Sequence, residues 1–217
     1  MDTMIITVGR QLGSGGRAIG KLIADKLGYA FYDKEILNMA AKESGFSEKF
    51  FEQNDENRGF MRSLFHMHMP HLSDDNFYDN RFSPAGLFKF QSDAITHAAS
   101  DGGCVFVGRC ADYILRDHAN LVNIFISAAV SWRVEHVMKR HDCSYQEAIK
   151  IIDKAESARA SYYNYYTGKR WGDSASYDLC IDSSILGIEE TAEFICNFVH
   201  KVQSTEMKFN GNVNGNG

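Results

Sequence analysis

A glycine-rich turn between a short strand and a helix, close to the start of the chain, most constrains how this chain can fold. Residues 4–8 are apolar and rich in β-branched side chains, which predicts a buried strand. Beyond the turn, Ile19, Ile23 and Leu27 recur at helical spacing. Backbone N–H groups and the positive end of a helix dipole converge at such a turn, and glycine lets an anion come close. The sequence therefore predicts an anion-binding loop at residues 13–16.

This loop is close to the phosphate-binding pattern G-x-x-x-x-G-K-[ST] but does not match it strictly. If Gly15 is the last loop glycine, Gly16 occupies the lysine position and Arg17 the hydroxyl position. If Gly16 is the last glycine, Arg17 occupies the lysine position and Ala18 the hydroxyl position. Arg17 is then the cation placed to compensate, and an ordinary glycine-rich turn is the alternative. The candidate phosphate-binding residues are Gly13, Ser14, Gly15, Gly16, Arg17 and Ala18.

Strands and helices are expected to alternate along the whole chain. Residues 104–107 and 121–126 are continuous apolar runs, typical of strands that are covered on both faces of a parallel sheet. Helical patterns separate these runs, so we expect an α/β fold with helices on both faces of the sheet. We expect a single domain at 1–207, with a lid or mobile insertion at 55–83 and a disordered tail at 208–217.

Composition excludes several classes of protein. A net charge of −5 argues against binding to a nucleic acid polymer, and no apolar run approaches the roughly 20 residues of a membrane span. The five cysteines are odd in number and lack C-x-x-C spacing, which favours reduced thiols. The sequence opens directly with strand residues, so we expect no signal peptide and a cytoplasmic protein.

Polar side chains follow two of the expected strands. Asp33 ends the second strand, and Arg109 and Asp112 follow the apolar run 104–107. Ligands of parallel sheets bind at the carboxyl ends of the strands, where a guanidinium is a good bidentate partner for phosphate. Alternatively, Asp33 caps the next helix and Arg109 forms a salt bridge between a strand end and a helix.

A tyrosine-rich helix provides a second cation. At helical spacing Arg159, Tyr162, Tyr163 and Tyr166 share one face, which places a guanidinium beside an aromatic wall. Such a wall suits a phosphate or a stacked base. A plain tyrosine-rich core face is the alternative, but it does not account for the arginine.

Three histidines, His66, His68 and His71, resemble a metal cluster at first sight. They lack a helical i, i+4 pair and any nearby cysteine or glutamate ligand set, which favours a solvated loop. The sequence leaves the metal ligands unknown.

Taken together, these residues resemble the cytidylate kinase-like family, a divergent branch of the P-loop nucleoside monophosphate kinases. The resemblance is carried, in order, by the segments 13–17 (GSGGR), 32–37 (YDKEIL), 107–112 (VGRCAD), 154–166 and 177–182 (YDLCID). It implies a P-loop-type three-layer sandwich around a parallel sheet of about five strands, with a helical lid or insertion. It also implies ATP and Mg²⁺, and phosphoryl transfer to a small acceptor such as the nucleoside monophosphate CMP.

On this resemblance the glycine loop would hold the donor phosphates, and Arg17 and Arg159 would be the catalytic cations. The acceptor would be bound by Asp33, Arg109, Asp112, Tyr162 and Tyr163. Three features depart from cytidylate kinases proper: the P-loop lysine is missing, Cys110 replaces the aspartate of Gly-Arg-Asp, and the lid helix keeps one clear arginine, Arg159. A nucleotide- or phosphate-binding protein with weak or no turnover is therefore the alternative function. The sequence is also compatible with a homodimer.

Overall fold

The computed structural model describes residues 3–33 and 84–213. The strands are β1 (Ile5–Arg10), β2 (Ala30–Tyr32), β3 (Cys104–Val107), β4 (Leu121–Ser127) and β5 (Leu179–Asp182). The helices are α1 (Gly16–Leu27), α5 (Pro84–Ser100), α6 (Ala111–Ile114), α7 (Val130–His141), α8 (Tyr145–Thr167) and α9 (Ser183–Val213), with a 3-10 turn η2 (Ser174–Ser176). The predicted lid at 55–83 and the three histidines within it lie outside the described residues.

All five strands are parallel, in the order β2-β3-β1-β4-β5, which confirms the predicted α/β class. Val8 of β1 pairs with Val107, the last residue of β3, so β1 runs two residues further than its neighbour. Arg10, at the end of β1, therefore stands beside the turn that follows β3. The Gly108 N–H donates to the Val8 carbonyl at 3.0 Å and fixes this turn against β1.

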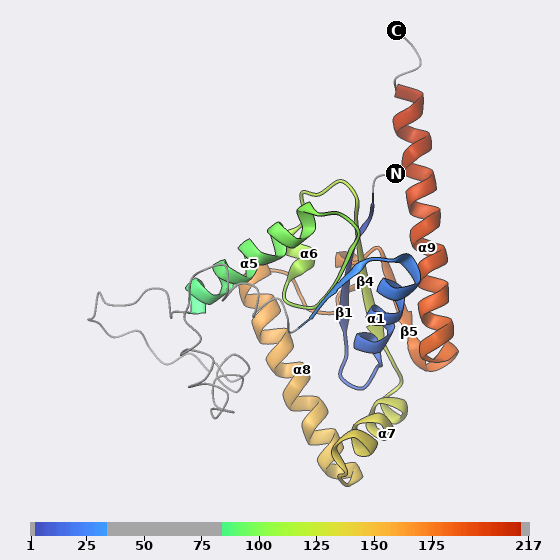
Figure 1. Ribbon diagram of the computed structural model, residues 1–217. Coiled ribbons are helices and arrows are strands. Elements are labelled where there is room, and N and C mark those ends of the chain that lie inside the picture. Colours follow the sequence, from blue (N-terminus) through green and yellow to red (C-terminus); the bar gives the residue numbers. More distant parts are fainter. Residues whose placement is uncertain (1–2, 34–83, 214–217) are drawn as a thin grey trace, which may run out of the picture.

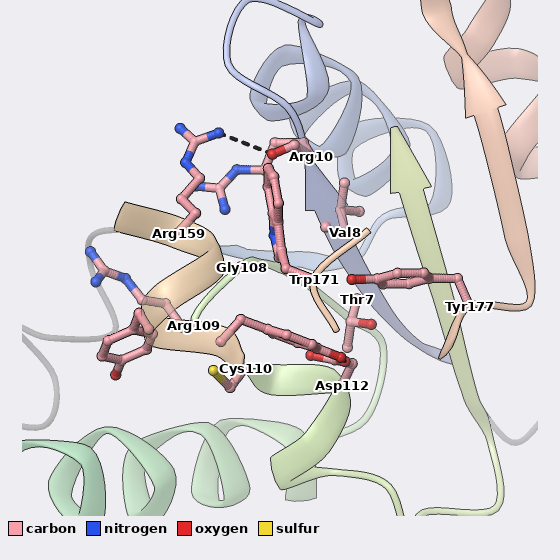
Figure 2. A pocket seen from close by; sticks show the side chains of 13 residues that line it. Thr7, Val8, Arg10, Gly108, Arg109, Cys110, Asp112, Arg159, Trp171 and Tyr177 are labelled. Atoms are coloured by element: carbon pink, nitrogen blue, oxygen red, sulfur yellow. Dashed lines mark hydrogen bonds between the residues drawn. The ribbon is translucent and has the colours of Figure 1, made fainter. Parts of the chain in front are cut away.

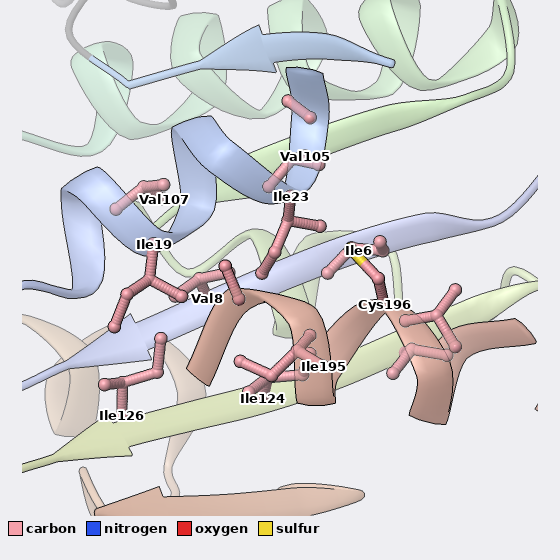
Figure 3. Close-up of a cluster of buried hydrophobic side chains, with 14 of the residues drawn as sticks. Ile6, Val8, Ile19, Ile23, Val105, Val107, Ile124, Ile126, Ile195 and Cys196 are labelled. Carbon is pink, nitrogen blue, oxygen red and sulfur yellow. The ribbon is translucent and has the colours of Figure 1, made fainter. Parts of the chain in front are cut away.

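Helices cover both faces of the sheet (Figure 1). Helices α1 and α9 pack on one face, where Ile19 and Ile23 of α1 and Ile195 of α9 meet the central strands (Figure 3). On the other face, Ile95 of α5 and Leu115, the residue after α6, are buried against the strands. These buried side chains account for the fold, because burial of apolar surface is the main favourable term in folding.

The part of the second face over β4 is covered by the segment between α8 and β5. The Phe125 ring of β4 lies 5.4 Å from the Trp171 ring and 5.0 Å from the Tyr177 ring, centroid to centroid. Helices α7 and α8 pack together through Val134, Val137, Ala148 and Ile152. They form a hairpin that projects past the sheet, as Figure 1 shows.

Two helix ends follow local signals in the sequence. Gly28 ends α1 in a left-handed conformation, and Ser144 begins α8 through a reciprocal capping box with Glu147. Helix α9 (Ser183–Val213) opens with a short turn, where Asp182 Oδ1 accepts from the Ser184 N–H at 2.9 Å, and its long continuous part follows Gly187. The backbone is non-helical at Gly187.

Helix α9 extends to Val213, so the tail predicted to begin at residue 208 overlaps the end of this helix. Residues 214–217 lie outside the described part of the chain. None of the helices among the described residues is long and apolar enough to cross a membrane.

Candidate functional site

The glycine loop joins β1 to α1 as predicted, and its glycines are required by the backbone. Gly13 and Gly15 have φ values of 83° and 75°, which L side chains rarely adopt. A Cβ on Gly13 would also lie 2.6 Å from the Arg133 carbonyl oxygen. Helix α1 begins at Gly16, its N-cap residue Gly15 makes no side-chain cap hydrogen bond, and Ser14 Oγ accepts from the Gly16 N–H at 3.4 Å. The first-turn N–H groups of this helix are therefore suited to an anion.

The Ser14 hydroxyl is engaged in hydrogen bonds within the loop. The residue is fully buried, and its Oγ donates to the Gln11 carbonyl at 3.0 Å. Its own carbonyl accepts from the Ser183 hydroxyl at 2.7 Å. Ser14 thus ties the loop internally and to the start of α9.

Two predicted site residues, Arg17 and Asp33, form an ion pair with each other. Arg17 Nε lies 2.7 Å from Asp33 Oδ2, and the side chains are 56% and 7% exposed. The guanidinium also lies over the Phe31 ring, 5.8 Å from its centroid. This ion pair therefore links a residue predicted to bind the ATP phosphates with a residue predicted to bind the phosphate acceptor.

A pocket opens at the carboxyl ends of β1 and β3, beneath α8 (Figure 2). Of the predicted residues, it brings together Arg109, Asp112, Arg159, Tyr162 and Tyr163. The rest of its lining is Thr7, Val8, Gly9, Arg10, Gly108, Cys110, Trp171 and Tyr177. Arg17, Asp33 and the loop residues 13–16 are outside this lining.

The turn that carries Arg109 is strained. Gly108, Arg109 and Cys110 have φ values of 76°, 65° and 56°, so three successive residues are left-handed. Gln91 Nε2 donates to the Arg109 carbonyl at 2.8 Å and holds the turn from α5. Strain of this kind is typical of functional sites, and here it directs a guanidinium toward the pocket. The Cys110 thiol is buried, which raises its pKa to about 12, so it is not an activated nucleophile.

Asp112 and Tyr163 form a buried polar pair at the pocket. The Tyr163 hydroxyl donates to Asp112 Oδ2 at 2.6 Å. Burial raises the pKa of Asp112, and the hydrogen bond from Tyr163 acts in the opposite direction. Burial and Asp112 also raise the pKa of Tyr177 to about 12, so this phenol stays protonated. The group offers carboxylate oxygens and phenol hydroxyls to the polar edge of a ligand.

Helix α8 is anchored to the glycine loop at two points. Arg159 Nη1 donates to the Arg10 carbonyl at 3.0 Å. One turn earlier, Glu156 Oε1 accepts from the Leu12 N–H at 3.3 Å and from Arg133 Nη1 at 2.5 Å. Arg133 is only 6% exposed, so its charge depends on this carboxylate. Burial lowers the pKa of Arg159, and Glu156 acts against that shift.

The predicted aromatic face of α8 divides between two roles. Tyr162 lines the pocket, and its hydroxyl accepts from Gln91 Nε2 at 3.3 Å. Tyr166 instead stacks on Phe88 of α5, with ring centroids 4.0 Å apart. The alternative of an aromatic packing face therefore fits Tyr166. Arg159, Tyr162 and Tyr163 instead line the pocket.

Sequence reasoning missed Arg10, Tyr177 and the Glu156–Arg133 pair. Like Arg109, Arg10 is a cation at the end of an apolar strand. It was not singled out because it lies within the stretch that was compared with the P-loop pattern. Burial, together with the positive charges of Arg159 and Arg109, lowers the pKa of Arg10 to about 9, while the Asp33 carboxylate acts in the opposite direction. A bound anion would relieve this mutual repulsion of cations.

A parallel sheet with a glycine loop after β1, and arginines at the strand ends around one pocket, defines a kinase of the P-loop type. The sequence model of the cytidylate kinase-like family matches residues 5–185. The chain belongs to the cytidylate kinase-like family.

Similar proteins include several cytidylate kinases. The cytidylate kinase of Pyrococcus horikoshii is 30% identical over 185 residues, which cover 84% of this chain and 81% of the relative. The cytidylate kinase of Pyrococcus abyssi is 29% identical over 183 residues, 83% of this chain and 85% of the relative. A cytidylate kinase of Saccharolobus islandicus is 21% identical and covers 92% of both chains.

Solved structures show the same fold. An uncharacterized protein from Eubacterium ventriosum is 25% identical with a TM-score of 0.67, covering 91% of this chain and 98% of the other. A shikimate kinase from Acinetobacter baumannii, in complex with shikimate, has a TM-score of 0.51 at 10% identity and covers 92% and 94%. A gluconokinase from Sinorhizobium meliloti has a TM-score of 0.51 at 15% identity and covers 96% and 97%. These two kinases share the architecture alone.

Proposed function

We propose that this kinase transfers the γ-phosphoryl group of ATP to a nucleoside monophosphate, with CMP as the first candidate. The observation that carries the proposal is that Arg109 and Arg159, from two separate elements, line one pocket beside the glycine loop. Guanidinium groups bind phosphate bidentately, and phosphoryl transfer depends on positioning and positive charge. CMP comes first because the relatives from the two Pyrococcus species are named cytidylate kinases.

On the donor side, the backbone of Gly13, Ser14, Gly15, Gly16, Arg17 and Ala18 would hold the ATP phosphates. Asp33 engages only Nε of Arg17, so within the described residues both Nη groups of Arg17 stay available to a phosphate oxygen. Arg159 would approach the same phosphates from α8.

On the acceptor side, Arg109 would bind the phosphate of the monophosphate. Asp112 and Tyr163 would take the hydroxyl or amino groups of the nucleoside, and Tyr162 would flank it. Asp33 would act through its pair with Arg17 at the junction of the two sides.

Magnesium would enter with ATP. Across residues 3–33 and 84–213, no group of three or more His, Cys, Asp or Glu side chains could hold a metal ion. The hydroxyl position of the loop is occupied by Arg17 or Ala18, according to the layout. The side chains present do not form a metal site of their own, and Mg²⁺ commonly binds through substrate phosphates and water.

The experiment measures ADP formation from MgATP with CMP, UMP, dCMP, AMP and GMP as acceptors. Arg109→Ala should raise the KM for the acceptor at least about tenfold, since a charged hydrogen bond contributes roughly 1.5–3 kcal/mol. Arg116→Ala removes an arginine that lies against Tyr113 outside the pocket, and it should leave the KM unchanged.

A phosphate-binding protein without turnover is the second candidate, favoured by the glycine at the lysine position of the loop. It would be established if ATP raised the melting temperature while no acceptor received phosphate. If neither ATP nor phosphate shifted the melting temperature, both functions would be excluded. The homodimer and the cytoplasmic location stay predictions.

A further inference from the structure

The glycine loop can be compared with the P-loop pattern position by position. With Gly15 as the last loop glycine, the first glycine of G-x-x-x-x-G-K-[ST] falls on Arg10 and the lysine falls on Gly16. The loop thus has a glycine where the pattern has its cation, and a cation where the pattern has its first glycine.

Structure explains why these two changes occur together. The Arg10 stem runs across Gly16: a Cβ at position 16 would lie 2.5 Å from Arg10 Cβ and 3.0 Å from Cγ. Gly16 is the first residue of α1 and is not left-handed, so its backbone alone would accept a side chain. Only the Arg10 stem excludes one. Arg10 therefore occupies the volume in which a lysine at position 16 would begin.

The far end of Arg10 is also accommodated by a glycine. A Cβ on Gly108 would collide with Arg10 Nη1, so the guanidinium passes directly over the turn that precedes Arg109. In Figure 2 this guanidinium lies in the pocket between Arg159 and Gly108.

Arg10 differs from the other arginines near the loop in its partners. Arg17 pairs with Asp33, Arg133 pairs with Glu156, and Arg159 donates to a carbonyl. Within residues 3–33 and 84–213, no hydrogen bond or ion pair engages the Arg10 guanidinium. Arg10 is a half-buried cation that the charges of Arg159 and Arg109 repel. The Asp33 carboxylate acts on it electrostatically but forms no ion pair with it, so an anion in the pocket would complete its contacts.

We propose that Arg10 replaces the P-loop lysine and that its guanidinium contacts the phosphoryl group in transfer. In that step an oxygen of the acceptor phosphate forms a bond to the γ-phosphorus, and the bond from the γ-phosphorus to the β–γ bridging oxygen breaks. The electron pair of the broken bond leaves with ADP. Arg10 stabilises the charge on the transferring group and keeps its own proton. This role in transfer rests on the proposed function, whereas the contact with phosphate does not.

The test exchanges the two positions. Arg10→Gly should lower kcat about 100-fold, because removal of one donor to a transition-state charge typically costs 10²–10³. Gly16→Lys alone should also lower kcat and reduce the melting temperature, since the lysine collides with the Arg10 stem. The double variant R10G/G16K restores glycine and lysine to their positions in the pattern, and it should recover at least about tenfold over R10G. Arg116→Ala is the charge-matched control and should retain the wild-type kcat.

A second readout is independent of turnover. Inorganic tripolyphosphate, titrated calorimetrically, should bind R10G at least about tenfold more weakly than wild type. If wild type transfers no phosphate, the proposed function fails and this titration still tests Arg10. The inference is overturned if R10G keeps its tripolyphosphate affinity, or keeps kcat within about threefold of wild type. It is also overturned if R10G/G16K melts like wild type without recovering activity.

Discussion

Arg17 Nε lies 2.7 Å from Asp33 Oδ2, which joins a half-exposed cation at the start of α1 to a buried carboxylate just after β2. Arg17→Ala would leave the carboxylate without this partner, and we expect the free energy of unfolding to fall by about 1–3 kcal/mol. Urea denaturation measures this loss. The double variant R17A/D33N should recover most of it, because the uncompensated charge is then gone.

Lys21→Ala, which removes an exposed pair with Asp25, is the control and should cost less than about 0.5 kcal/mol. Equal losses of unfolding free energy for Arg17→Ala and Lys21→Ala would contradict the view that Arg17 compensates the buried Asp33 carboxylate.

Gly13 and Gly28 provide a matched pair of left-handed glycines. Both have positive φ, but a Cβ on Gly13 would meet the Arg133 backbone whereas nothing lies within 4 Å of a Cβ on Gly28. Gly28→Ala should therefore cost only the left-handed conformation, about 1–2 kcal/mol. Gly13→Ala should cost distinctly more and should displace the loop, so that ATP affinity also falls. Thermal denaturation and ATP titration of both variants check this, and equal losses of stability would show that the loop is not held against α7.

Glu156 joins α8 both to the loop and to a buried arginine. Glu156→Gln keeps an oxygen for the Leu12 N–H but removes the negative charge beside Arg133, whose side chain is 8% exposed. Removal of one partner from a buried pair typically costs about 3–5 kcal/mol. We expect a lower melting temperature for this variant and, because Arg159 lies one turn further along α8, a lower kcat.

Asp93→Asn breaks the exposed pair with Lys89 and should change neither the melting temperature nor kcat. A wild-type melting temperature for Glu156→Gln would disprove the anchoring.

The pKa of Asp112 predicts a dependence of stability on pH. Burial raises this pKa above its ordinary value of 3.8, so the folded state holds the proton more tightly than the unfolded state. The stabilisation from this proton is present at low pH and is lost as the pH rises from 3.8 through the folded pKa. Asp112→Asn abolishes the titration and keeps an oxygen for the Tyr163 hydroxyl. Relative to wild type, this variant should therefore gain stability as the pH rises above 3.8.

Urea denaturation at a series of pH values gives the difference between Asp112→Asn and wild type. Asp117→Asn alters an exposed carboxylate nearby and should stay within about 0.5 kcal/mol of wild type. A pH-independent difference for Asp112→Asn would show that burial does not control this carboxyl group. The variant should also lose affinity for the nucleoside monophosphate, because it cannot offer a carboxylate to the ligand.

The sequence was sufficient for those parts of the fold and site that depend on local patterns. Continuous apolar runs located β3 and β4, and the ends of such strands pointed to Arg109 and Asp112. Helical spacing placed Arg159 and Tyr163 on one face of α8, and both line the pocket.

Contacts between distant segments could not be found in this way. The pairing of Arg17 with Asp33 depends on how β2 lies beside β3, and no periodicity encodes that order. The bond between Leu12 and Glu156 joins residues 144 positions apart and depends on how α8 docks.

Positions 10 and 16 share one volume, which has a consequence for how this loop varies among related chains. Two long side chains there are sterically exclusive, and two glycines would leave the pocket short of one cation. We therefore expect the two positions to change as a pair, so that a lysine at the second accompanies a small residue at the first. A motif search that scores each position separately would rate such loops as degenerate. A search that scores positions 10 and 16 together would recognise loops in which the cation is at either position.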